Sequence, residues 1–423
     1  MIYQTSDISE VYYGNINIVS GYVGNDLIFP SESPTPPTPT VNEYLNFTAV
    51  DGDAVIGMSG SASVNVMYSF DKYTWRNLET PYQHRTVTIP NGRTVYISGN
   101  NTNEFSTSVT NYKQFTISGT VEANGNIQSL LYGSNFDNLT IPNDYCFYQL
   151  FNNCTGLLTA PQLPATTLAD FCYAAMFRDC TSLTSAPQLP ATALTKNCYD
   201  CMFQGCTSLT SAPILHSTNL ARGCYYAMFI NCTSLTTAPV LPATTLAETC
   251  YDSMFEYCTG LTSAPQLPAT TLAEACYSEM FASCKSLTSA PQLPATTLAE
   301  ACYREMFMEC TSLTTAPVLP ATTLAEYCYY GMFLGCTSLT TAPVLPALNL
   351  VYWCYHLMFD GCSNLNYIKA MFLEIALNSG ALGDWTRNVA SNGTFVKNIN
   401  ATWDVRGDSG VPNDWTIQYE APN

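Results

Sequence analysis

Cysteine pairs are the residues of this sequence whose type and spacing could do chemistry. In the stretch ACYREMFMECTSLTT, Cys302 and Cys310 stand eight residues apart. Two thiols at such a spacing could hold a metal, form a redox-active disulfide, or pack as small apolar side chains in a core. The way in which the pair recurs along the chain decides among these possibilities.

The pair belongs to a repeat of 26 residues. Nine cysteines follow one another at this period: Cys146, Cys172, Cys198, Cys224, Cys250, Cys276, Cys302, Cys328 and Cys354. Nine more stand eight residues after them: Cys154, Cys180, Cys206, Cys232, Cys258, Cys284, Cys310, Cys336 and Cys362. Self-similarity at a fixed period over this length predicts a solenoid of nine units.

Each unit is predicted to contain a short amphipathic helix followed by an extended segment. At about 100° per residue, the apolar side chains between Cys302 and Cys310 share one helical face. Four units begin with the Thr-x-x-Glu pattern of a capping box, which occurs at Thr245–Glu248, Thr271–Glu274, Thr297–Glu300 and Thr323–Glu326. The segment SLTTAPVLP is then expected to return as a strand or rung, and its proline keeps sheet pairing short and interrupted.

The predicted helix limits what the thiols can do. Eight helical residues rise roughly 12 Å, whereas the Cα atoms of a disulfide lie within about 7 Å. Bridges between equivalent positions of neighbouring units are disfavoured less strongly, and zinc would need four ligands at one point instead of parallel rows. The preferred interpretation is a stack of core thiols, with some disulfides or a metal as alternatives. The isolated Cys198–Cys201 C-x-x-C pair is a weak redox signal.

No pattern predicts a catalytic site or a cofactor. His84, His216 and His356 are scattered, and none is paired by spacing with a nucleophile. The repeated glutamates could suggest the carboxylate pair of a glycosidase, but the capping box explains them. The Asp51–Asp53 stretch DGD is too short for a calcium loop. We therefore expect a protein that is not an enzyme.

The charge balance narrows the partners. Of the 423 residues, 32 are acidic and 14 are Lys or Arg, which gives a formal charge of −18. Phosphate backbones and anionic lipids would be repelled, so neither nucleic acid nor a membrane surface is expected as a partner. No apolar run reaches the ~18 residues of a membrane span, so membrane insertion is not expected. The opening residues MIYQTSDISEVYYG do not have the pattern of a secretory signal.

The motifs CTSLTTAP, LPATTLA and CYxxMFxxC resemble BspA-type leucine-rich repeats, a family of surface proteins of gut bacteria and their phages. The resemblance covers residues from about 143 to 368. It implies an α/β leucine-rich-repeat solenoid, right-handed and curved, with strands on one side and helices on the other. It implies adhesion and binding of protein or glycan, and not catalysis.

The flanks predict four further segments. Residues 1–30 contain Gly-Asn turns at Tyr12–Asn15 and Tyr22–Asn25, which are typical of hairpins. This module resembles N-terminal modules of tailed-phage structural proteins, and the resemblance implies attachment to the virion through Tyr13, Tyr22, Ile28 and Phe29. An ordinary hairpin module is the alternative. Residues 31–42 are a proline-rich linker.

Residues 43–133 alternate in hydrophobicity and are predicted to form an all-β sandwich-like domain. The segment resembles the β-domain that precedes such repeats, and we expect it to cap the first rung of the solenoid at residues 134–369. Residues 370–423 are predicted to be a small β-rich cap. Trp385, Trp403 and Trp415 are expected to cover the last rung, with a tryptophan-based sugar site as the alternative.

A candidate binding surface follows from the rows that should face water. The position after each strand proline gives a row that includes Gln162, Gln188, Ile214, Gln266 and Gln292, and Tyr226 and Tyr330 lie outside the predicted apolar arc. The third unit departs from the consensus at ILHSTNLARGC, which adds His216, and the last unit departs at ALNLVYWC. We also expect the strand side to be concave, because helices are bulkier than strands.

Two functions remain as hypotheses. The first is a phage virion appendage, a head or tail fibre-like protein whose N-terminal module contacts other virion proteins and whose repeats bind a host-surface protein or polysaccharide. The protein would be assembled in the host cytoplasm and displayed on the virion surface. A homo-oligomer is one of the forms it could take there. The alternative is a bacterial cell-surface adhesin of the same repeat family.

Overall fold

The computed structural model describes residues 42–375 and 379–421, together with four two-residue strands near the N-terminus. These are β1 (Tyr12–Tyr13), β2 (Ile16–Asn17), β3 (Tyr22–Val23) and β4 (Asp26–Leu27). β1 pairs antiparallel with β2, and β3 with β4, at the two places where hairpins are predicted. The chain divides into two compact units, Met1–Thr38 and Pro39–Asn423.

Of the four anchoring residues predicted in the first unit, the structure describes two. Tyr13 lies in β1 and Tyr22 lies in β3. Ile28, Phe29 and residues 31–41 of the predicted linker lie outside the described residues.

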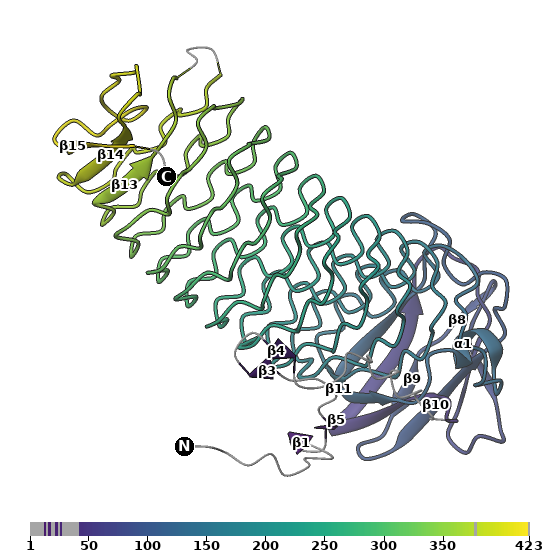
Figure 1. Cartoon of the computed structure of the whole chain (residues 1–423). Helices are drawn as coiled ribbons and strands as arrows, with labels where there is room; N and C mark the ends of the chain where they lie inside the picture. Colours follow the sequence, from purple (N-terminus) through teal and green to yellow (C-terminus); the bar gives the residue numbers. More distant parts are fainter. Residues whose placement is uncertain are drawn as a thin grey trace, which may run out of the picture. The chain divides into compact units, whose positions relative to one another are not determined.

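The second unit has strands and turns but almost no helix, so the prediction of an α/β leucine-rich-repeat solenoid is wrong. Strands account for 22% of the structure and helices for 1%. The one helix among the described residues is α1 (Ser129–Tyr132), which precedes the repeats. Figure 1 shows the repeats as a stack of coils, drawn from teal to green, between an N-terminal sheet and a small C-terminal sheet.

Each segment predicted to be a helix is a run of overlapping four-residue turns. The amide of Met306 turns back to the carbonyl of Tyr303, at 3.4 Å. The amides of Tyr303 and Phe307 instead donate to Cys328 and Met332 of the next coil, at 3.1 and 2.9 Å. An α-helix would direct every amide to its own i−4 carbonyl. Here every second amide points along the axis of the coil.

Left-handed backbone conformations recur every fourth residue and produce this alternation. In the unit of Cys302 they fall at Ala301, Glu305 and Glu309, and the three equivalent positions of all nine units have φ between 49° and 75°. Only five of these positions are glycine, namely Gly205, Gly223, Gly331, Gly335 and Gly361. The φ > 0 region costs an L-residue free energy, so packing and the bonds between coils must offset that cost at the other positions.

The sequence pattern misled because a period of four is close to the helical period of 3.6. Residues at i, i+4 and i+8 drift by only about 40° per step on a helical wheel, so nine residues still appear to share one face. The Thr-x-x-Glu patterns are likewise not capping boxes. Thr297 and Thr245 instead form isolated parallel bridges with Thr323 and Thr271 of the next coil.

Sheet pairing along the coils is as short as the prolines predict. A second line of single-residue bridges joins equivalent serines and threonines, such as Ser185 to Ser211 and Ser289 to Thr315. The residues two positions later are prolines, which have no amide to extend the pairing. The prediction of interrupted pairing is therefore confirmed.

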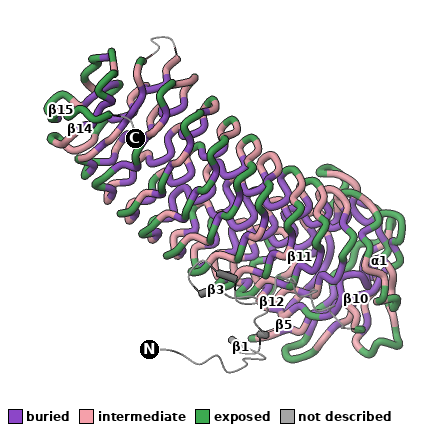
Figure 2. The backbone as a smooth tube through the Cα atoms, viewed as in Figure 1, coloured by how far each residue is buried: buried purple, intermediate pink, exposed green. Residues whose placement is uncertain are grey.

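The interior of the coil is built from ladders of identical side chains, and Figure 2 shows that buried residues recur in every coil. The tyrosines from Tyr173 to Tyr355 stack with ring centroids 5.8–6.0 Å apart. The phenylalanines from Phe151 to Phe359 stack at 5.4–5.8 Å. All are buried, and the eighteen periodic cysteines lie among them at 1% exposure or less. Their predicted place in the core is confirmed.

The second cysteine of each unit is also a hydrogen-bond donor. The thiol of Cys310 donates to the carbonyl of Phe281 in the preceding coil, at 3.1 Å, and the same bond recurs from Cys180 to Cys362 at 3.0–3.1 Å. Cysteine is small enough for the ladder and still offers a weak donor to a buried carbonyl. No pattern in the sequence indicates this role.

The N-terminal domain contributes seven strands to one sheet of eight, whose remaining strand belongs to the first coil, so the predicted sandwich is wrong. The strands are β5 (Leu45–Ser59), β6 (Val66–Ser69), β7 (Arg76–Thr80), β8 (Gln83–His84), β9 (Val87–Ile89), β10 (Thr94–Gly99), β11 (Gln114–Asn124) and β12 (Leu157–Thr159). Their order is β12-β11-β5-β10-β6-β7-β8, and β9 pairs with the far half of β5.

Two long strands replace the two layers of a sandwich. β5 pairs with β10 over its first residues and with β9 after Asp51 and Gly52, which have φ of 60° and 131°. Opposite this point the register of β11 shifts at Gly119, where a Cβ would come within 2.9 Å of the Asp53 carbonyl. This irregularity lets β5 pair with β10 along its first half and with β9 along its second half. The alternation of apolar and polar residues in the sequence does not reveal this change of partner.

This sheet caps the first coil, as predicted. β11 pairs parallel with β12, which is the first rung. Phe115 of β11 stacks on Phe151 with centroids 5.3 Å apart, and its carbonyl accepts the thiol of Cys154 at 3.4 Å. Phe115 thus occupies the place that a phenylalanine of an earlier repeat would take.

The C-terminal residues continue the coil and then close it. β13 (Tyr367–Ala370), β14 (Thr394–Asn398) and β15 (Thr416–Glu420) form a parallel three-stranded sheet. The predicted boundary at residues 369/370 therefore falls inside β13. Trp385, Trp403 and Trp415 are at most 7% exposed, and each indole N–H donates to a main-chain carbonyl. Their predicted capping role is confirmed, and no open ring face remains for a sugar.

Over residues 143–368 the coil has no helices opposite its strand side. The prediction that the strand side is concave rested on bulky helices there, so that reason does not hold for turns. Among the residues that the structure describes, no helix is long and apolar enough to cross a membrane.

The turn geometry predicts opposite effects of glycine at two neighbouring alanines. Ala301→Gly should raise the free energy of unfolding by up to about 1 kcal/mol, because it relieves a φ of 51°. Ala299→Gly, the matched control at a position without positive φ, should lower it by about 0.5–1 kcal/mol. Chemical denaturation of the full chain measures both changes. Equal losses for the two variants would contradict the turn assignment.

Candidate functional site

The coil exposes one row of residues that follow the strand prolines, which we call the post-proline row. Its members are Gln162, Gln188, Ile214, Val240, Gln266, Gln292, Val318 and Val344. Seven are exposed, and Gln162 is half-buried because it bridges to Asn126 of the N-terminal domain. The predicted surface row is therefore present, but its side chains are spread along the coil and do not converge on one point.

The post-proline row is hollowed at one place. Ile214 and Val240, which are 48% and 74% exposed, stand beside Pro213 and Pro239 around a depression of about 150 Å³. A hollow of this size is below the roughly 300 Å³ of a small-molecule site. It is a shallow apolar patch.

The turn segments expose a second surface, which we call the turn face. Tyr226 and Tyr330 lie there in equivalent positions, four coils apart, so the structure does not bring the two predicted tyrosines together. His216 replaces a proline of the consensus next to Leu215 and lies apart from both. Burial lowers the pKa of His216 below its ordinary value.

Tyr330 belongs to a cluster of rings, which we call the aromatic cluster, made of Tyr327, Tyr330, Tyr352, Trp353 and His356. Trp353 stacks on His356 with centroids 4.3 Å apart and planes 9° apart, and Tyr330 stacks on His356 at 5.3 Å. Tyr352 stands 5.5 Å from Trp353 and is 41% exposed. These rings remain accessible, unlike the buried ladders of the interior.

A cation and a tight approach of backbone complete this cluster. The guanidinium of Arg304 lies 5.5 Å from the ring centroid of Tyr330, which is a cation–π distance. On the other side Gly380 lies against Trp353, where a Cβ would come within 2.5 Å of the indole nitrogen. The rings are therefore held in place before any ligand arrives.

Sequence reasoning selected only Tyr330 from the aromatic cluster. Tyr352 and Trp353 lie in ALNLVYWC, where the last unit departs from the consensus. Aligning the units at period 26 places Tyr327 above Trp353 and Tyr330 above His356, so the clustering could have been read from the sequence. The clustering was missed because a helical wheel compares residues within one unit and does not show which side chains of neighbouring units lie together.

Acidic residues occupy the middle of the turn face. Asp252, Glu256, Glu279 and Glu305 lie on neighbouring coils, and Arg304 is 2.9 Å from Glu305 and 3.8 Å from Glu279. Burial, reinforced by the charge of Glu279, raises the pKa of both Asp252 and Glu256 to about 7. The guanidinium of Arg304 is therefore shared between the carboxylates of Glu279 and Glu305.

The cysteines are not arranged for chemistry. All nineteen are free thiols. Burial raises the pKa of Cys172 and of Cys310 to about 12, so neither forms the reactive thiolate near neutral pH. Cys201, the half-buried member of the C-x-x-C pair, also has a raised pKa, because of burial and the neighbouring Asp200.

One buried ion pair lies in the N-terminal domain. Lys113 donates to Glu79 Oε1 at 2.9 Å and to the Gly60 carbonyl, and both side chains are at most 3% exposed. His84 Nδ1 lies 2.6 Å from the same oxygen, although its ring is largely exposed. These contacts join β7 and β8 to the residue that precedes β11, and they give His84 a structural explanation.

Comparisons with protein families, with curated proteins and with solved structures yield no match for this chain. Within residues 42–375 and 379–421, no group of three or more His, Cys, Asp or Glu side chains is arranged to hold a metal ion. The aromatic cluster is the arrangement on the coil that is best prepared for a ligand.

The raised pKa values predict a pH dependence of stability. Between about pH 4 and 7 the folded chain holds protons on Asp252 and Glu256 that the unfolded chain releases. Stability from these groups therefore rises as the pH falls through 7, so the melting temperature should be higher at pH 5.5 than at pH 8 (about 1 °C for each kcal/mol in a chain of this size).

The double variant D252N/E256Q isolates this effect. It should melt higher than wild type at pH 8 and show a reduced difference between the two pH values. Glu300→Gln, which removes an exposed charge two coils further along, is the control and should keep the wild-type difference. An unchanged pH dependence in the double variant would contradict the assignment.

Proposed function

We propose that this chain is a non-enzymatic adhesion protein, carried as an appendage of a phage virion, whose coil binds a protein or polysaccharide on the host surface. The observation that carries the proposal is the aromatic cluster, a group of partly exposed rings on a rigid scaffold. Such rings are typical anchors of binding surfaces, because they bury much area at little cost in conformational entropy.

The construction of the coil supports this function. Each coil is fixed to the next by main-chain bonds and by stacked rings, so the outer rows keep their spacing without a ligand. Both ends are closed, by Phe115 and its sheet and by Trp385 and its neighbours. A repeat array needs such caps to remain soluble while it presents a long side surface.

The charge supports the choice of ligand class. A chain with a formal charge of −18 is repelled by nucleic acid and by strongly anionic polymers. Neutral polysaccharides and protein surfaces remain. The proposed attachment to other virion proteins through residues 1–30 rests on the resemblance of that module to N-terminal modules of phage structural proteins.

Binding to host cells tests the adhesion function. Fluorescently labelled full-length protein should bind cells of the host bacterium, and Tyr352→Ala should weaken that binding by roughly tenfold, because a central aromatic anchor is typically worth 1–2 kcal/mol or more. Tyr257→Ala, which removes a 46% exposed tyrosine outside the cluster, should bind like wild type. Equal binding by both variants would reject the aromatic cluster as the site.

Deletion of residues 1–30 tests the attachment. The full chain should co-purify with phage particles, and the deleted chain should be absent from them although it folds and still binds cells. If the deleted chain still decorates virions, the attachment is wrong. If the protein is instead found on the surface of uninfected bacteria, the alternative of a bacterial adhesin replaces the virion appendage.

A further inference from the structure

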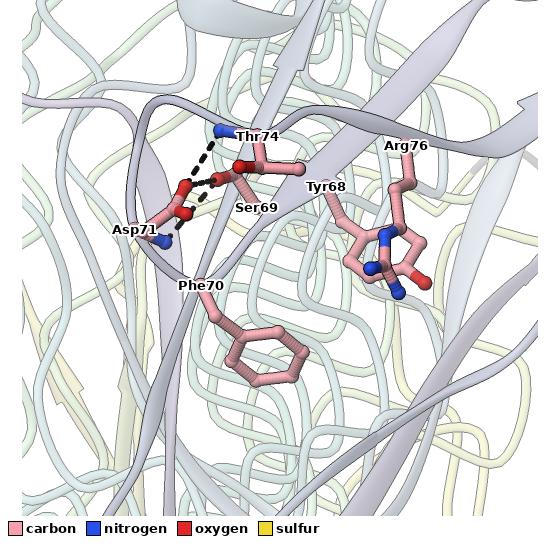
Figure 3. A pocket seen from close by; sticks show the side chains of 6 residues that line it. All are labelled: Tyr68, Ser69, Phe70, Asp71, Thr74 and Arg76. Atoms are coloured by element: carbon pink, nitrogen blue, oxygen red, sulfur yellow. Dashed lines mark hydrogen bonds between the residues drawn. The ribbon is translucent and has the colours of Figure 1, made fainter.

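A second hollow lies in the N-terminal domain, away from the repeats. It has a volume of about 180 Å³ and is lined by Tyr68, Ser69, Phe70, Asp71, Thr74 and Arg76. These residues come from the end of β6, the start of β7 and the loop between them. Figure 3 shows two rings, one carboxylate and one guanidinium around it.

The sheet itself brings the aromatic and the cationic side chains together. Tyr68 and Arg76 are direct partners in the antiparallel pairing of β6 with β7. Directly paired residues project from the same face of a sheet with their Cβ atoms about 5 Å apart. Phe70 meets Tyr68 edge to face, with ring centroids 6.2 Å apart and planes at 87°. The ring of Tyr68 and the guanidinium of Arg76 therefore lie side by side at this hollow, with the ring of Phe70 next to them.

The loop that carries Asp71 is locked in place. Asp71 Oδ1 accepts bonds from the amide of Tyr73 at 2.8 Å, from the amide of Thr74 at 2.6 Å and from the hydroxyl of Ser69 at 2.9 Å. Ser69 in turn accepts the amide of Lys72 at 2.9 Å. A carboxylate fixed by three donors costs no ordering when a ligand binds.

Two polar groups at this hollow keep capacity for a ligand. The guanidinium of Arg76 forms no hydrogen bond and no ion pair within the part of the chain that the structure describes, so its five N–H donors are available. The three bonds to Asp71 end on Oδ1, which leaves Oδ2 as an acceptor. These bonds also hold the pKa of Asp71 well below its usual range, so the group is an acceptor at any physiological pH.

We propose that this hollow binds a single neutral sugar ring, as the end or a side branch of a polysaccharide. Sugar rings have apolar C–H faces, which pack on aromatic rings, and hydroxyls, which accept from a guanidinium and donate to a carboxylate. The volume is below the roughly 300–1,000 Å³ of drug-sized ligands, which suits one ring and excludes a large cofactor. This site goes beyond the proposed function, because it lies in the sheet domain and shares no residue with the coil.

The paired charges favour a neutral sugar over an acidic one. A carboxylate on the ligand would gain the contact with Arg76 but would also face the fixed anion of Asp71. A neutral ring can use both groups through its hydroxyls. The negative charge of the whole chain acts in the same direction.

Ligand-observed nuclear magnetic resonance on the full chain tests the proposal. The probes are the methyl glycosides of glucose, galactose, mannose and N-acetylglucosamine, with glucuronic acid as the acidic comparison. At least one neutral probe should bind with a dissociation constant of about 1 mM. Arg76→Gln and Phe70→Leu should each weaken it by roughly tenfold, because a bond to a charged donor and a ring contact are lost.

Arg85→Gln is the matched control, because it removes an exposed arginine of the same domain that does not line the hollow. It should bind like wild type, and the melting temperatures of all three variants should agree. The proposal is overturned if no neutral glycoside binds, if only glucuronic acid binds, or if Arg76→Gln and Phe70→Leu bind as the control does. Tyr352→Ala in the coil should leave this affinity unchanged, which separates this site from the proposed adhesion site.

Discussion

Every second amide of the turn segments points along the coil axis, and the rest of the structure depends on finding an acceptor for it in the next coil. A buried amide without a partner would cost about 1–3 kcal/mol. Each coil therefore has to repeat the backbone path of its neighbour, including the left-handed residue at every fourth position. This requirement explains why positions such as Ala301 and Glu305 keep a φ that is unfavourable for an L-residue.

The same requirement produces the ladders in the interior. When backbone paths repeat, equivalent side chains stand directly above one another, so a tyrosine is followed by a tyrosine and a cysteine by a cysteine. The cysteine rows fit this geometry because a thiol is small and, in the second row, donates to the carbonyl of the coil before it. The ends cannot be satisfied by another repeat. Phe115 and Trp385 replace the missing rings at the two ends of the stack.

Function can reside only on positions that the ladder leaves free. The post-proline row and the turn face carry the variation between units, and the turn face gathers it into the aromatic cluster at one end. The sheet domain follows a different rule, because its hollow is built by cross-strand pairing of Tyr68 with Arg76 and by a locked loop. The two surfaces are chemically alike, in that each combines aromatic rings with an arginine, but they arise from unrelated backbone geometry.

The sequence by itself determined the repeat, its period of 26, the burial of its cysteines and aromatic residues, the shortness of its sheet pairing and the closure of both ends. Identity at fixed spacing and the chemistry of proline are local facts that need no coordinates. Only the tertiary structure decided between a helix and a run of turns. Over nine residues, a period of 3.6 and a period of 4 both place the apolar side chains on one face, so the sequence pattern is the same for both. The hydrogen bonds that distinguish turns from a helix run between coils, as from the Tyr303 amide to the Cys328 carbonyl. The sequence of a single unit does not reveal a bond to a residue 25 positions away. The aromatic cluster could have been found by aligning the units, whereas the hollow around Arg76 was decided only by the tertiary structure, because it depends on the pairing of Tyr68 with Arg76.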